Sequence, residues 1–140
     1  MSDSKLLNKS YNEQSIEDLQ KDVLLWDEVL QASLEELLFY KNLLSANIFE
    51  QDIPNMFEKL QMFQSKLEEL HTDKIDLTLA VRHHKNDLSG MMECEDIGCD
   101  TFYRSWHKKL SNWMIEDSEK FEELKFRIIR YSTPLLKQLN

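Results

Sequence analysis

Glycine and proline, which most often break helices and form tight turns, are scarce in this sequence. The 140 residues contain two of each. This scarcity excludes a fold made of many short strands and hairpins, and it favours a few long helices with few connections. The two cysteines, Cys94 and Cys99, are too few for a disulfide-rich scaffold, although they could close a small loop in an oxidising compartment.

Basic charge and long apolar runs are also lacking. The chain has 17 Lys and Arg residues against 26 Asp and Glu residues, which gives a formal net charge of −9. Such an acidic chain is poorly suited to nucleic acid or anionic membranes, so we expect neither as a partner. No run of about 20 apolar residues could span a membrane, and residues 1–14 lack the features of a secretory signal. We therefore expect a cytoplasmic protein.

The sequence carries no motif that marks a reaction. It has no glycine-rich phosphate loop, nucleophile elbow or pair of Cys-x-x-Cys motifs. Glu-x-x-His occurs once, from Glu68 to His71, whereas di-iron bundles use it twice. Helical bundles can host catalysis without a motif, so this absence lowers the case for an enzyme without closing it. We expect a non-enzymatic protein that needs no cofactor.

What the sequence does contain is a long alternation of three- and four-residue steps between large apolar side chains, from residue 16 to residue 44. This spacing places the side chains along one side of an α-helix. Ser15 is a good N-cap, and acidic residues follow in the first turn, where the helix dipole favours negative charge. We predict a helix over about 15–47. Its buried stripe consists of Ile16, Leu19, Val23, Trp26, Leu30, Leu37, Tyr40 and Leu44.

Two further segments repeat this alternation and predict helices over about 53–89 and 100–132. Pro54 opens the second helix, Ser89 and Gly90 end it, and Asp100 or Thr101 caps the third after a loop over 91–99. The stripe of the second helix is Met56, Leu60, Phe63, Leu67, Leu70, Leu77, Val81 and Leu88. That of the third is Tyr103, Trp106, Leu110, Trp113, Phe121, Leu124, Ile128 and Tyr131.

Three helices of similar length with short connections predict an all-α, antiparallel, up-down-up three-helix bundle with coiled-coil-like packing. We expect a single domain over residues 15–140, preceded by a disordered N-terminal tail over residues 1–14. After Pro134, the leucines at 135, 136 and 139 predict a last short helical turn or a continuation past a kink.

Lys74 and Asp117 interrupt two apolar stripes at matching heights in this bundle. A buried charge needs a partner, so we predict an ion pair between them, covered by Trp26. One such pair without a second acid or base makes a poor catalytic site, and we favour a role in fixing the register of the helices. His84 also lies on a stripe, in a layer with Ile16 and Trp106.

Imidazole and thiol side chains converge on the end of the bundle that carries the loop over 91–99. They could hold zinc, because nitrogen and sulfur are the ligands that zinc prefers. The four candidate ligands are His84, Cys94, Cys99 and His107. Ordinary buried thiols and a His84 that fills a core layer are the interpretation we favour.

The same end is locally basic. Its basic residues are Arg82, His83, Lys85, Arg104, His107, Lys108 and Lys109. This cluster could receive an anionic ligand or an acidic peptide. Four carboxylates in the adjoining segment, Glu93, Glu95, Asp96 and Asp100, can neutralise it by folding back, and this second reading is favoured.

The first helix has more apolar residues than a three-helix core can use. Leu24, Leu25, Ala32, Leu38 and Phe39 lie roughly opposite its core stripe. We predict that they form an interface, most simply a two-fold homodimer in which the first helices stack. The expected function is a protein-interaction module, such as an adaptor, a chaperone-like protein or a regulatory partner. The alternative is a bundle that binds a metal or a small ligand at its His- and Cys-rich end.

Overall fold

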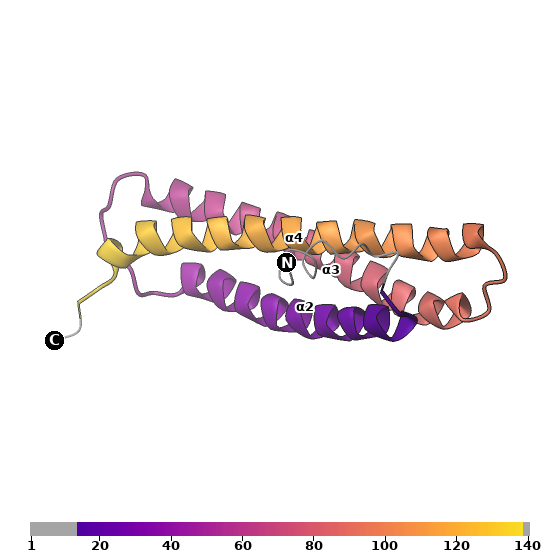
Figure 1. Ribbon diagram of the computed structural model, residues 1–140. Coiled ribbons are helices and arrows are strands. Elements are labelled where there is room, and N and C mark those ends of the chain that lie inside the picture. Colours follow the sequence, from indigo (N-terminus) through magenta and orange to yellow (C-terminus); the bar gives the residue numbers. More distant parts are fainter. Residues whose placement is uncertain (1–13, 139–140) are drawn as a thin grey trace, which may run out of the picture.

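The computed structural model describes residues 14–138, and three long helices make up most of them (Figure 1). They are α2 (Ile16–Ser45), α3 (Met56–Met91) and α4 (Ile97–Ser132), followed by the short 3-10 turn η1 (Thr133–Leu135). Figure 1 shows the three helices running side by side and alternating in direction. The predicted all-α three-helix bundle is therefore confirmed, as is the short C-terminal turn. The tail predicted over residues 1–14 falls almost entirely outside the described residues, as does Leu139.

The first helix begins where the sequence predicts. The Ser15 hydroxyl accepts a hydrogen bond from the backbone N–H of Asp18 at 3.1 Å, and the Asp18 carboxylate accepts one from the N–H of Ser15. These two bonds satisfy amides that the first turn of a helix cannot pair internally.

Helix α4 also ends at the predicted residue, Ser132, whereas both ends of α3 and the start of α4 differ from the predicted boundaries. Helix α3 begins at Met56, because Asp52 and Asn55 adopt left-handed backbone conformations with φ of 63° and 60°. It then continues through Gly90 to Met91, since a single glycine weakens a helix without stopping it. Helix α4 begins earlier than expected, at Ile97, because the Asp96 carboxylate caps it by accepting from the N–H of Cys99 at 2.7 Å. The loop predicted over 91–99 therefore shrinks to residues 92–96.

The core consists of two apolar clusters, one towards each end of the bundle. The first lies towards the connection over residues 46–55 and includes Leu37, Tyr40, Leu44, Phe49, Phe63, Leu67, Leu70, Phe121, Leu124 and Ile128. The second lies towards the connection over residues 92–96 and includes Leu19, Val23, Leu30, Leu77, Val81, Leu88, Met91 and Leu110. We call these the 46–55 end and the 92–96 end.

The C-terminal segment ties down the 46–55 end. The backbone N–H of Glu50 donates to the carbonyl of Leu135, and that of Lys137 donates to the carbonyl of Ile48, both at 2.7 Å. These bonds surround an isolated antiparallel bridge between Phe49 and Leu136, and Phe49 is buried. None of the described helices combines the length and the apolar character needed to cross a membrane.

Candidate functional site

The outer side of α2 carries the apolar residues predicted to form an interface. Leu24, Leu25, Leu38 and Phe39 are 51–59% exposed, whereas the leucines on the inner side are almost completely buried. Val29, which the sequence reasoning missed, adds a fifth apolar side chain that is 47% exposed. We call these five residues the outer stripe. The structure thus places the predicted residues together on a solvent-facing surface.

Carboxylates run along the middle of the outer stripe. Glu28 and Glu35 are exposed, and their spacing from Leu24 and Phe39 puts them on the same side of the helix. Neither forms a salt bridge with any residue from 14 to 138. The neighbouring Asp27 and Glu36 are used differently, since they pair with Arg82 of α3 and Lys125 of α4. The stripe therefore presents apolar side chains beside two unpaired negative charges.

Exposed apolar residues also occur along the other two helices. Those of α3 are 41–74% exposed: Phe57, Ile75 and Leu79. Those of α4 are 37–83% exposed: Ile97, Phe102, Trp106, Ile115, Phe126 and Ile129. Scattered exposed apolar residues are normal for a soluble protein. The outer stripe differs because five such residues gather on one side of about four turns of one helix.

Lys74 and Asp117 form the predicted buried ion pair. The Lys74 ammonium lies 2.5 Å from one oxygen of the Asp117 carboxylate, and the two residues are 0% and 3% exposed. Burial raises the pKa of Asp117, and the hydrogen bond from Lys74 opposes this effect. The second carboxylate oxygen of Asp117 has no hydrogen-bond partner among the described residues. With so little exposed surface, the pair is out of reach of a substrate and suits a register-fixing role.

The cover predicted for this pair is wrong. The ring over the Lys74 ammonium is Phe121, at 4.3 Å from the ring centre, and Trp26 instead stacks on His107 at 4.6 Å. Trp106 also fails the prediction, because it is 37% exposed while its neighbour His107 is fully buried. Both positions fit the three-and-four spacing, so periodicity alone cannot choose between them. The prediction that Trp106 lies in the core is wrong, and His107 takes that place.

The buried histidines form a chain of hydrogen bonds between all three helices. Nε2 of His84 lies 2.8 Å from Nδ1 of His107, and Nε2 of His107 lies 3.0 Å from the carboxylate of Asp22. Both histidines are 0% exposed. Burial lowers the pKa of His84 to about 4, with the neighbouring His107 acting in the same direction. The sequence placed His84 in the core, but nothing in it singled out Asp22.

The two cysteines are bonded to each other, so the four-residue zinc set does not form. Cys94 and Cys99 make a disulfide across the 92–96 connection, and the expectation of free buried thiols is wrong. Within residues 14–138, no group of three or more His, Cys, Asp or Glu side chains could hold a metal ion. Disulfides persist in oxidising compartments and are rare in the cytosol. The bridge therefore bears against the expected cytoplasmic location, which stays a prediction.

The predicted basic end is partly neutralised by carboxylates. Arg104 pairs with Asp100 at 2.8 Å, as expected, whereas Arg82 pairs with Asp27 on α2 at 3.0 Å rather than with the connecting segment. The remaining basic side chains are exposed, apart from the buried His107: His83, Lys85, Lys108 and Lys109. Glu68 also faces outward and pairs with Lys41, away from any metal-binding arrangement with His71.

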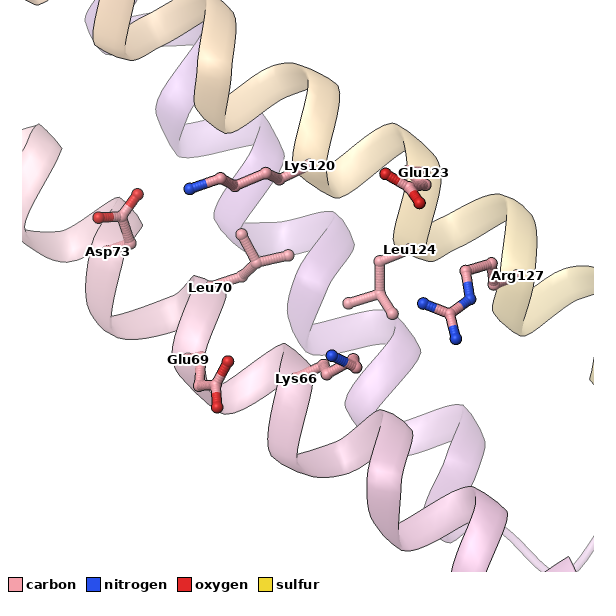
Figure 2. Close-up of a pocket in the computed structure, with 8 residues that line it drawn as sticks. All are labelled: Lys66, Glu69, Leu70, Asp73, Lys120, Glu123, Leu124 and Arg127. Carbon is pink, nitrogen blue, oxygen red and sulfur yellow. The ribbon is translucent and has the colours of Figure 1, made fainter.

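A groove of about 480 Å³ lies between α3 and α4, on the half of the bundle towards the 46–55 end (Figure 2). Leu70 and Leu124 face each other across it. The other lining residues are three basic and three acidic side chains: Lys66, Lys120, Arg127, Glu69, Asp73 and Glu123. Equal numbers of the two signs give the groove no net charge with which to select an anion or a cation.

Comparison with protein-family models, with curated proteins and with solved structures returns no match. The outer stripe gathers five exposed apolar side chains along one side of α2.

Proposed function

We propose that this protein is a non-enzymatic protein-interaction module that binds a partner helix along the outer side of α2. The observation that carries the proposal is the outer stripe itself, whose five apolar side chains are 47–59% exposed. Covering such side chains with another apolar surface is favourable by about 25 cal/mol for each Å² removed from water. An amphipathic helix laid along α2 would achieve this cover.

The charges on the stripe favour a basic partner. Glu28 and Glu35 lie between the apolar anchors, and the whole chain carries a net charge of −9. A partner helix with leucines facing the stripe and Lys or Arg beside them would place opposite charges together. We therefore propose a basic amphipathic helix as the occupant, because complementary charge speeds encounter and fixes register.

Self-association through the first helix, expected from the sequence, is the competing arrangement. The stripe is nearly symmetric about a point between residues 31 and 32, so a two-fold pairing would set Leu25 opposite Leu38 of a second copy. The same symmetry would set Glu28 opposite Glu35 of that copy, and like charges would meet near the middle of the interface. This repulsion is the reason that we favour a basic helix over a second copy.

The proposal is tested with two synthetic helical peptides of about 20 residues, long enough to be helical in part. Both carry leucines at three-and-four spacing; one has lysines beside them and the other has glutamates. We expect the wild-type protein to bind the lysine peptide, by calorimetry, and not the glutamate peptide. Leu25→Glu combined with Phe39→Glu should abolish binding, because it places charges in the apolar contact.

The matched control is Ile75→Glu combined with Leu79→Glu on α3, which adds the same charge outside the stripe and should leave binding unchanged. Equal loss in both double variants would contradict the proposal. Sedimentation equilibrium of the wild type tests whether the protein binds a second copy of itself instead. A mass that rises towards twice the 16.8 kDa of one chain, lost in the α2 variant alone, with no binding of the lysine peptide, would overturn the basic partner in favour of a second copy.

A further inference from the structure

The first turns of α4 are held to the bundle with little apolar burial. Between Ile97 and Leu110, the buried residue that α4 contributes is His107. Ile97 and Phe102 point largely to solvent, at 83% and 67% exposed, and Trp106 is 37% exposed. The half-buried Tyr103 packs against the apolar cluster of this end. The later part of α4 differs, because it buries Phe121, Leu124 and Ile128 in the core. Attachment at the 92–96 end thus combines the packing of Tyr103 with the contacts of the fully buried His107.

The hydrogen-bond chain through His107 is complete when both histidines are neutral, and each proton then has one position. The Asp22 carboxylate accepts a hydrogen bond, so Nε2 of His107 must carry the proton. Nδ1 of His107 is then an acceptor, and Nε2 of His84 must donate to it. This leaves Nδ1 of His84 without a proton, and this buried nitrogen has no hydrogen-bond partner among the described residues. The next proton to reach this site would therefore arrive at an enclosed, unsolvated position.

Each helix places charged or aromatic groups near the two rings. On the α2 side, Asp22 accepts from His107, and Trp26 stacks on the same ring. On α3, the charge of Asp87 favours a proton on His84, but burial and His107 outweigh it. On α4, the charge of Arg104 disfavours a proton on His107. Whichever ring carries the charge of an added proton, Nδ1 of His84 becomes a buried N–H donor with no partner among the described residues, which is unfavourable.

We propose that His84 and His107 form an acid-sensitive latch that holds the first turns of α4 against α2 and α3 and that releases them when protons bind. In the closed state the pKa of His84 is lowered to about 4, and burial also lowers the pKa of His107. In the open state both rings are solvated, with pKa values near 6.5. Below about pH 6.5 the open state therefore binds more protons than the closed state, so acid favours opening.

The size of the effect follows from proton linkage. Between about pH 6.5 and about pH 4, His84 raises the opening equilibrium constant by up to about tenfold per pH unit. His107, whose pKa burial also lowers, adds to this dependence in the same direction. Above pH 6.5 the latch contributes no pH dependence. The 46–55 end should stay closed over the same range, because apolar side chains and the backbone bonds of Glu50 and Lys137 hold it. Opening is therefore local to the 92–96 end.

Amide hydrogen exchange, corrected for the intrinsic effect of pH, tests the latch. From about pH 7 to about pH 5, we expect protection over residues 101–110 to fall by at least about tenfold more than protection over residues 121–131. His84→Gln keeps an amide that can hydrogen-bond to His107 but does not titrate, so it should remove up to about tenfold per pH unit of this dependence. His83→Gln, at the exposed neighbouring position, should behave like the wild type. Equal pH dependence in the two segments, or an unchanged dependence in His84→Gln, would overturn the proposal.

A second measurement covers the case in which His84→Gln does not fold. Ring titration of the wild-type histidines by NMR should leave His84 neutral in the folded protein down to about pH 5, because burial lowers the pKa of His84 to about 4. If His84 titrated in the folded protein near pH 6.5, the closed and open states would bind protons equally. The latch would then have no driving force, and the proposal would fail.

Discussion

The two sides of α2 are built from the same residue types and have opposite environments. Leu19, Val23, Leu30 and Leu37 on the inner side are at most 1% exposed, whereas Leu24, Leu25 and Leu38 on the outer side are more than 50% exposed. The inner side is satisfied within the chain, because α3 and α4 cover it. The outer side has no cover among the described residues. The comparison separates leucines that stabilise the fold from leucines available for binding.

The largest expected effect comes from truncating matched leucines on the two sides. Leu30→Ala leaves a cavity in the core and should lower the free energy of unfolding by about 2–5 kcal/mol. Leu25→Ala deletes the same atoms from a side chain that is exposed to solvent. It should change the free energy of unfolding by less than about 0.5 kcal/mol. Urea denaturation of both variants at low protein concentration measures the difference. Similar losses of unfolding free energy in both variants would mean that the outer side of α2 also stabilises the fold, which would contradict the distinction between the two sides.

A smaller effect is expected on binding, where outer-side residues matter and inner-side residues do not contact the partner. Phe39→Ala should weaken binding of the lysine peptide about tenfold, because truncating a contact aromatic typically costs more than 1 kcal/mol. Its free energy of unfolding should stay close to the wild-type value. Leu79→Ala on α3 is the control and should change neither quantity by much. Calorimetric titration beside urea denaturation separates the two effects, and an unchanged affinity in Phe39→Ala would remove this residue from the proposed contact.

Local spacing made much of the fold predictable. The three-and-four alternation predicts the three helices, and the apolar excess of the first helix predicts the outer stripe apart from Val29. The helix ends were harder, because they depend on single residues whose backbone or side chain is set by tertiary contacts. Asn55, with φ of 60°, and Asp96, with its bond to the N–H of Cys99, decide where α3 and α4 begin. Neither choice is visible in hydrophobic periodicity.

The polar interior was predicted in part. Lys74 and Asp117 stand out because charged residues interrupt apolar stripes at matching heights. His107 does not stand out in this way, since Trp106 beside it fits the same spacing and looks like the better core residue. Asp22 is harder still, because it is half-buried at the edge of the core and gains its role only from the ring that reaches it. Such contacts between distant segments are set by the tertiary fold and leave no local pattern in the sequence.

The most direct test of the central claim is a charge reversal on the outer stripe. Glu28→Lys combined with Glu35→Lys leaves the apolar anchors intact and inverts the charge between them. We expect this variant to lose affinity for the lysine peptide and to gain affinity for the glutamate peptide. The same two-charge reversal at Glu116 and Glu119 of α4 should leave the wild-type preference. A variant that still prefers the lysine peptide would contradict the claim that the outer side of α2 recognises a basic helix.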